Sequence, residues 1–263
     1  MAFCTHNGRT INYRLLGQAN KPLLVLAHPL GMTQGIWDDM LPALLTQFRV
    51  LTWDLPGHGA SSAWPANSSA IEAEDLALEA LSLAELAGAE RFHFAGTSIG
   101  GVIGQQLLSR HADKLLSATL TNTGPVIGTA DGWQQRSAMV MDKGLEAMAV
   151  DIVPRWFGPL ACQQQPALID GWRVQLGRTD RRSYALLCEM LGRCNFTEVF
   201  KGKSLPPIKV IAGTDDVATP PSSLEALSSA LGVAAPLVWE NVGHVPAVEC
   251  PERFVEVLAR QLS

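Results

Sequence analysis

One short turn constrains the fold of this chain more than any other feature. Residues 94–101 read Phe-Ala-Gly-Thr-Ser-Ile-Gly-Gly, and this Gly-x-Ser-x-Gly turn lies between an apolar run and an amphipathic helical pattern. Between a strand and a helix, such a turn forces its serine, here Ser98, into a strained backbone conformation, and the flanking glycines leave room for the close approach. The sequence therefore predicts that the Ser98 side chain stands exposed above a sheet, as a nucleophile does.

Short runs rich in Val, Leu and Ile alternate with helical patterns along the chain. This alternation is typical of an α/β fold in which helices wrap a mostly parallel sheet. Ser69 and Glu72 are spaced as a capping box and predict a helix that ends at Gly88, while a last helix begins at Pro251. Strands are expected at 10–16, 23–27, 49–53, 92–95, 116–121, 208–212 and 237–240.

Residues 124–203 differ from the rest, because they have helical periods and no strand pattern between their ends. This segment follows one strand and precedes the next, so it should lie over the carboxyl ends of the strands, where open α/β sheets bind ligands. We expect a core of residues 1–123 and 204–263 and a helical cap of residues 124–203. Helices within the cap are predicted at 133–150, 167–176 and 181–193.

A serine nucleophile needs a base, and the base needs an acid that orients it, in the chain order serine, acid, histidine. Of the six histidines, His244 follows the last expected strand and precedes the last helix. The acid should follow the strand at 208–212, where Asp215 and Asp216 compete. Spacing favours Asp216, which leaves Asp215 as a capping or solvated residue. The loop after the preceding strand, at 121–123, holds no carboxylate.

Ester hydrolysis passes through a tetrahedral oxyanion, so two backbone N–H donors should face Ser98. One is the amide of Ile99, directly after the nucleophile. The other should come from the loop after the second strand, where residues 28–31 read His-Pro-Leu-Gly. Pro29 has no N–H and cannot donate, so Leu30 is the predicted second donor.

Composition and charge argue against several other functions. The chain has 263 residues, of which 47% are hydrophobic and 17% charged, so it can bury a full core. A net charge of −5 without a basic run gives no support for a nucleic-acid partner, and the apolar runs are too short to cross a membrane. Five cysteines without a close pair and the absence of a secretory pattern indicate a cytoplasmic protein. Neither a metal nor an organic cofactor is expected, and nothing indicates an oligomeric state.

Taken together, these residues resemble the α/β-hydrolase superfamily over almost the whole chain. Residues 54–61 look like its structural Asp-x-x-Gly-x-Gly-x-Ser turn, in which we expect His58 to be structural. Residues 213–220 are similar to its acid loop, and residues 243–251 look like the segment with its histidine. The resemblance implies an α/β-hydrolase fold with a catalytic triad of Ser98, Asp216 and His244. One departure is that many members have His-Gly where this chain has His28-Pro29.

Within the superfamily, the chain most resembles 3-oxoadipate enol-lactonases. The stretch 178–188 is similar to their Thr-Asp…Tyr-Ala…Cys pattern. The resemblance implies a serine hydrolase of small esters or lactones in aromatic-compound degradation, with a carboxylated substrate that needs a cation or amide donors in its pocket. Trp133 and Arg136 are the predicted substrate-binding residues, and further cations of the cap are Arg155, Arg173 and Arg178. For each of these residues, a place on a solvated helix face or in the core of the cap is an equally good interpretation.

Two alternatives share these motifs. A general carboxylesterase or thioesterase of a different substrate uses the same triad, and a non-catalytic binding protein of this fold can retain it. Chemistry with an aspartate nucleophile is disfavoured because position 98 is serine. In each reading the partner is a small molecule.

Overall fold

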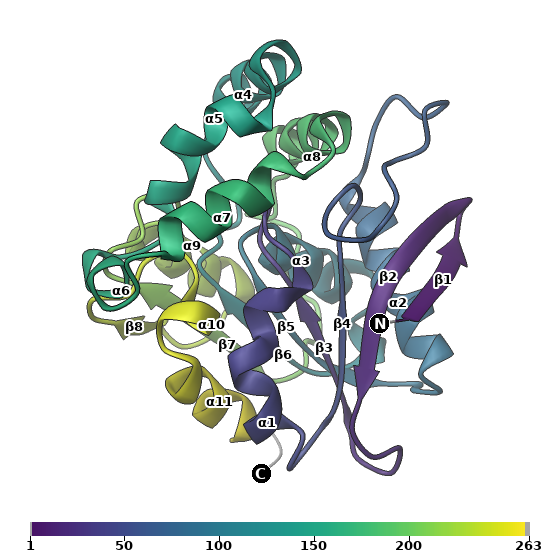
Figure 1. Cartoon of the computed structure of the whole chain (residues 1–263). Coiled ribbons are helices and arrows are strands. Elements are labelled where there is room, and N and C mark those ends of the chain that lie inside the picture. The colour runs from purple at the N-terminus through teal and green to yellow at the C-terminus, as the bar shows by residue number, and fades with distance from the viewer. Residues whose placement is uncertain (1, 261–263) are drawn as a thin grey trace.

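The strands of the chain pair into one mixed sheet. The computed structural model describes residues 2–260, and within them eight strands follow the order β1-β2-β4-β3-β5-β6-β7-β8 (Figure 1). β2 pairs antiparallel with β1 and β4, and the remaining neighbours are parallel. Their bounds are Ala2–His6 (β1), Arg9–Leu16 (β2), Leu23–Ala27 (β3), Arg49–Trp53 (β4), Phe92–Thr97 (β5), Leu115–Thr121 (β6), Ile208–Gly213 (β7) and Leu237–Trp239 (β8).

The expected strands lie within two residues of β2 to β8 at each end, so the predicted α/β class is confirmed. β3 reads as a continuous apolar run because all of its residues are buried between helices. β1, a half-buried edge strand, was not among the expected strands. Its signal was the dipeptide Asn7-Gly8, with φ of 48° and 75°, since a two-residue hairpin turn needs positive φ at both positions and favours Asn-Gly.

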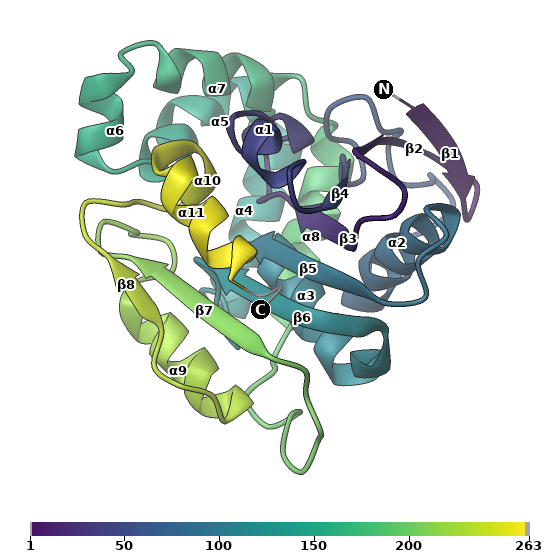
Figure 2. The same ribbon diagram turned by 90° about the horizontal axis from the view of Figure 1, so that it is seen from below.

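Helices cover both faces of the sheet. Figure 2 shows α1 (Leu41–Leu44) and α11 (Pro251–Ala259) on one face, and α2 (Ala73–Leu86), α3 (Ile99–Arg110) and α9 (Pro221–Leu231) on the other. Shorter elements complete the core: α10 (Pro246–Glu249) and 3₁₀ helices at Gln34–Met40 and Ala112–Lys114. The predicted start of the last helix at Pro251 is confirmed.

The predicted start of α2 is wrong by three residues. Glu72, not Ser69, is the N-cap, and its side chain accepts from the backbone of Asp75. The Asp75 carboxylate in turn accepts from the Glu72 amide at 2.8 Å. The reciprocal capping box therefore exists one turn later than predicted, with an acid at both positions.

The segment between β6 and β7 is helical throughout its regular structure. It contains α4 (Ala130–Lys143), α5 (Leu145–Ile152), a 3₁₀ helix at Val153–Arg155, α6 (Pro159–Gln164), α7 (Leu168–Gly177) and α8 (Arg181–Arg193). The single helix expected at 133–150 is two, because Gly144 has φ of 79° and ends α4. These helices gather at one end of the sheet (Figure 1). The division at residues 123/124 and 203/204 stays a prediction.

A buried ion pair joins β2 to α2. The Arg9 side chain and the Glu79 side chain are 1% and 2% exposed, and the guanidinium donates to both carboxylate oxygens at 2.7 to 2.9 Å. A further guanidinium N–H donates to the Ser62 carbonyl at 2.9 Å. Removing one partner would leave the other charge uncompensated in the protein interior.

We expect Glu79→Ala to lower the free energy of unfolding by about 3–5 kcal/mol, because Arg9 would stay buried without its carboxylate. Urea denaturation measures the change. Glu198→Ala is the control: Glu198 pairs with Lys201 on the surface, so little change is expected. Equal losses in the two variants would contradict the role of burial.

Candidate active site

Ser98 stands alone between a strand and a helix, in a strained backbone conformation. Its φ is 59° and its ψ is −117°, a combination that residues other than glycine rarely adopt. β5 ends one residue before it and α3 begins one residue after it. A Cβ at Gly96 would lie 2.2 Å from the Gly100 carbonyl oxygen, and one at Gly100 would lie 2.1 Å from the Ala27 carbonyl oxygen. Both glycines are therefore required for α3 to start so close to β3 and β5.

Hydrogen bonds to the end of β6 hold this turn. The Ser98 amide donates to the Thr121 carbonyl at 3.0 Å, and the Thr123 hydroxyl donates to the Ser98 carbonyl at 2.9 Å. The serine backbone is thus fixed on both sides. Ser98 was predicted to be exposed above the sheet, but it is only 8% exposed, because it faces a cavity that residues of the segment 124–203 also line.

Of the two adjacent aspartates, Asp216 contacts His244. The His244 Nδ1 and the Asp216 Oδ2 lie 2.8 Å apart, and the two residues are 5% and 2% exposed. Asp215 lies elsewhere: its Oδ1 accepts from the Thr214 hydroxyl at 3.2 Å. The arrangement can orient the imidazole and stabilise a positive charge on it.

Several donors besides His244 hold the Asp216 carboxylate. The Ala218 and Thr219 amides donate to Oδ1 at 2.8 and 3.0 Å, and the Thr219 hydroxyl donates to Oδ2 at 2.6 Å. Burial alone would raise the pKa of Asp216, but the charge of His244 and the hydrogen bonds from His244 and Thr219 outweigh it and lower this pKa below its usual range. The carboxylate therefore stays ionised beside the imidazole.

Asn122 is a residue of the site that the sequence analysis missed. It follows β6 with φ of 47°, and its Nδ2 donates to Asp216 Oδ2 at 3.0 Å and to the Gly243 carbonyl at 2.8 Å. One amide thus joins the acid loop to the histidine loop. The signal was the position of Asn122 in the loop after the strand at 116–121, where some relatives have the acid: a side-chain amide there can donate to the acid of the next loop.

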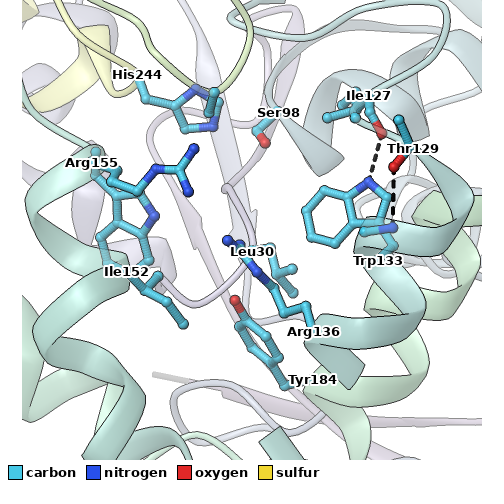
Figure 3. Close-up of a pocket in the computed structure, with 14 residues that line it drawn as sticks. Leu30, Ser98, Ile127, Thr129, Trp133, Arg136, Ile152, Arg155, Tyr184 and His244 are labelled. Atoms are coloured by element: carbon cyan, nitrogen blue, oxygen red, sulfur yellow. Dashed lines mark hydrogen bonds between the residues drawn. The ribbon is translucent and has the colours of Figure 1, made fainter. Parts of the chain in front are cut away.

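Ser98 and His244 line the same cavity without a hydrogen bond between them in the part of the chain that the structure describes. Figure 3 shows the serine hydroxyl and the imidazole both directed into this space. Catalytic hydrogen bonds are often long without substrate and tighten in the complex, so the arrangement is compatible with proton transfer between the two residues.

The two predicted oxyanion donors are free. Among the described residues, neither the Leu30 amide nor the Ile99 amide has a hydrogen-bond acceptor. The next amide of the loop, that of Gly31, donates to His58 Nε2 at 2.9 Å and so is not available. Pro29 and Gly31 thus leave Leu30 as the amide of this loop that can bind an oxyanion.

Two buried histidines fix residues 28–31, named the oxyanion loop after their predicted role, and the turn at 54–61. His58 Nε2 accepts from Gly31, and His28 Nε2 accepts from the Leu55 amide at 3.0 Å. Each ring therefore carries its proton on Nδ1, which lies 2.8 Å from the carbonyl of Pro56 and of Pro29 respectively. Burial lowers the pKa of His28 to about 4 and that of His58 to about 3. Both rings are neutral, as acceptance of a backbone N–H requires.

The turn at 54–61 also contacts α8. The rings of His58 and Tyr184 stack with centroids 6.4 Å apart, and the Asp180 amide donates to the Gly57 carbonyl at 2.8 Å. A Cβ at Gly57 would lie 2.7 Å from the Ser183 Cβ. The helix thus rests directly on the turn that supports the oxyanion loop.

A cavity of about 320 Å³ lies between the sheet edge and the helices above it (Figure 3). The loops at the carboxyl ends of the strands contribute Leu30, Ser98, Ala218 and His244. The segment 124–203 contributes Ile127, Gly128, Thr129, Gly132, Trp133, Arg136, Ile152, Arg155, Trp156 and Tyr184.

Both predicted substrate-binding residues line this cavity, and so does Arg155. The Arg136 guanidinium lies 5.2 Å from the centre of the Trp133 ring, whose Nε1 donates to the Ile127 carbonyl at 2.6 Å. Within residues 2–260, neither Arg136 nor Arg155 forms an ion pair with a carboxylate. The other two candidates do not line the cavity: Arg173 pairs with Asp170 at 3.1 Å, and Arg178 is exposed.

No group of three His, Cys, Asp or Glu residues in the described part of the chain is placed to hold a metal ion. None of its helices is long and apolar enough to span a membrane. All five cysteines are free thiols.

Comparisons with known proteins agree with this geometry. A family model described as "Alpha/beta hydrolase family" matches residues 24–257. The chain is 28% identical to 3-oxoadipate enol-lactonase 2 of Acinetobacter baylyi over 244 residues, which cover 93% of this chain and 90% of the relative. It is 26% identical to a pimeloyl-[acyl-carrier protein] methyl ester esterase of Aeromonas hydrophila, covering 90% of this chain and 94% of that protein. The crystal structure of the enol-lactonase from Burkholderia xenovorans superimposes with a TM-score of 0.91 at 30% identity, covering 99% of each chain.

We expect the free energy of unfolding to fall as the pH falls, because of the buried His28 and His58. Unfolded histidine takes up a proton below about pH 6.5, whereas folded His28 and His58 stay neutral down to about pH 4 and 3. Each histidine should therefore lower the free energy of unfolding by about 2 kcal/mol when the pH is lowered from 7 to 5.

His58→Gln tests this, because the glutamine does not titrate and its oxygen can still accept from Gly31. Urea unfolding at pH 7 and pH 5 should show a smaller loss in the variant, by about 2 kcal/mol. The same loss in both proteins would show that His58 does not contribute.

Proposed function

The chain belongs to the alpha/beta hydrolase family, and we propose that it hydrolyses small carboxylic esters or lactones through an acyl-enzyme on Ser98. The observation that carries the proposal is a single cavity that Ser98, His244 and Leu30 line together. The serine is strained, the histidine is hydrogen-bonded to an ionised aspartate, and the amides of Leu30 and of Ile99, the residue after the serine, have no acceptor among the described residues. These parts are what acyl transfer requires: a nucleophile, a base with its orienting acid, and oxyanion donors.

In the first half of the proposed reaction, the Ser98 oxygen attacks the substrate carbonyl while His244 takes the hydroxyl proton. The Leu30 and Ile99 amides donate to the oxyanion, and Asp216 stabilises the imidazolium that forms. His244 then returns the proton to the leaving oxygen as its bond to the carbonyl carbon breaks. With an enol-lactone, the leaving enol stays attached to the acyl group.

In the second half, water attacks the acyl-enzyme and gives its proton to His244. The tetrahedral intermediate collapses to the free acid, and the proton returns to Ser98. The strained turn suits both halves, because it presents the serine oxygen directly at the N-terminal end of α3, where the helix dipole favours negative charge.

The charge of the cavity supports a carboxylated substrate. Arg136 and Arg155 line it without a carboxylate partner in the described chain, so a substrate carboxylate can pair with them. Together with the likeness to enol-lactonases, this supports 3-oxoadipate enol-lactone as the substrate class. We also propose that residues 124–203 act as the cap that closes this cavity.

We expect Ser98→Ala to abolish hydrolysis, with kcat falling about 10⁴-fold or more, since the triad members act as a unit. The measurement is release of nitrophenol from a short-chain nitrophenyl ester, with a burst in the wild type and none in the variant. Ser109→Ala makes the same chemical change at the far end of α3 and should keep full activity. Full activity of Ser98→Ala would overturn the mechanism, and single-turnover release by the wild type would indicate a binding protein.

We expect Arg136→Met to weaken binding of the carboxylated enol-lactone about 10- to 100-fold, the equivalent of one charge-assisted hydrogen bond. The methionine keeps the apolar stem, so KM for a neutral saturated lactone or nitrophenyl acetate should change little. Arg178→Met, outside the cavity, is the matched control. If KM for the carboxylated enol-lactone were the same in Arg136→Met as in the wild type, as it is expected to be for the neutral substrate, the result would favour a general carboxylesterase or thioesterase.

A further inference from the structure

Glu249 stands outside the reaction described above, yet its carboxylate binds the loop that carries His244. It ends the short helix α10, and its side chain turns back toward the chain that precedes this helix. Oε2 accepts from the Gly243 amide at 2.9 Å, and Oε1 accepts from the Val245 amide at 3.1 Å. The same carboxylate therefore fixes the backbone on both sides of the histidine.

The Glu249 carboxylate also reaches into the segment above the sheet. Its Oε2 accepts from the Gly158 amide at 2.8 Å. Beside this bond, the His244 amide donates to the Trp156 carbonyl at 2.9 Å. The turn 156–158 and the loop 243–245 are thus joined in two ways. The Glu249 side chain accepts hydrogen bonds from both, and one backbone hydrogen bond links them directly.

The approach of these two segments requires glycine at position 243 and is tight at position 158. A Cβ at Gly243 would lie 2.5 Å from the Gly158 nitrogen. A Cβ at Gly158 would lie 3.1 Å from Asp215 Oδ2 and 3.2 Å from Glu249 Oε2. Trp156, at the start of the same turn, lines the cavity, so a shift of this turn would alter both the cavity wall and the histidine loop.

Glu249 does not compete with Asp216 for the imidazole. Nδ1 of His244 is bound by Asp216, and all three hydrogen bonds of Glu249 go to backbone amides. Partial burial raises the pKa of its carboxyl, which the amide hydrogen bonds oppose. A carboxylate in such a place is costly unless its oxygens are satisfied, and these amides satisfy them.

We propose that Glu249 is a positioning residue that sets the backbone of His244 and couples it to the turn 156–158 of the cap. The orientation of the catalytic base and the seating of the cap then depend on the same carboxylate. The proposal rests on the proposed function for its kinetic consequence, but its structural part, the protection of three amides by one side chain, does not.

The kinetic test compares Glu249→Gln, Glu249→Ala and, as a matched control, Glu252→Gln, an exposed acid three residues along the chain. A glutamine oxygen can accept from Gly158 and Gly243, but its NH₂ group would meet the Val245 amide, donor against donor. We expect kcat per site titrated with a fluorophosphonate to fall about 10-fold in Glu249→Gln and about 100-fold in Glu249→Ala, as for a misplaced catalytic group. KM for a small ester should stay within about twofold, and Glu252→Gln should match the wild type.

A purely structural role would lower the titrated fraction and the thermal midpoint without changing kcat per titrated site, and that result would overturn the proposal. The coupling to the cap has its own variant. Gly158→Ala keeps the carboxylate but inserts a methyl group between the turn and Glu249, so kcat per site should fall while Ser98 still labels. An unchanged kcat in Gly158→Ala would overturn the coupling.

Amide hydrogen exchange separates this proposal from the function on which it rests. In Glu249→Ala, exchange should accelerate together at Gly158, Gly243 and Val245, whether or not the wild type hydrolyses the esters tried. An inactive wild type with this pattern would refute the hydrolase mechanism alone. An active wild type whose three amides exchange at unchanged rates in Glu249→Ala would refute the role of Glu249 alone.

Discussion

Ser98 is held in a strained backbone conformation by the packing around its turn. Positive φ at a serine costs on the order of 1–3 kcal/mol and persists only where the surroundings fix it. Here they are the glycine contacts between α3 and the strands β3 and β5, and the hydrogen bonds from the end of β6. A parallel sheet places these neighbours at one edge, because the carboxyl ends of its strands lie there together. The strained turn therefore depends on the fold that surrounds it.

Three loops around the serine are held in the same way, by a side chain that accepts hydrogen bonds from backbone amides. His58 accepts from Gly31, Asp216 accepts from the amides that follow it, and Glu249 accepts on both sides of His244. Loops of irregular backbone gain defined positions in this way without regular structure. The Leu30 and Ile99 amides have no acceptor among the described residues, so they are available for a developing oxyanion. The neighbouring Gly31 amide is not available, because it already donates to His58.

Local patterns determined much of the fold. Seven strands, the serine turn and the start of the last helix follow from apolar runs, glycine spacing and an N-terminal proline, because each depends on residues adjacent in the chain. The errors have local causes as well. In the capping box of α2, Glu72 pairs with Asp75 and not with Ser69. Gly144 divides one expected helix into two. The turn at Asn7-Gly8 marks β1, which was not predicted.

The fold class and the chain order of a serine, an acid and a histidine could be predicted from the amino-acid sequence, since motifs and periodicity are properties of neighbouring residues. Spacing favoured Asp216 over Asp215, but the contact of Asp216 with the imidazole is seen in the tertiary structure alone. The tertiary structure also placed Arg136 and Arg155 in the cavity while it left Arg173 and Arg178 outside. The hydrogen bonds that Asn122 donates and the contact of Glu249 with the turn 156–158 are likewise tertiary. Each of these contacts and positions depends on segments that are tens of residues apart in the chain. The packing of helices and loops sets the distances between such segments, and no local pattern encodes it.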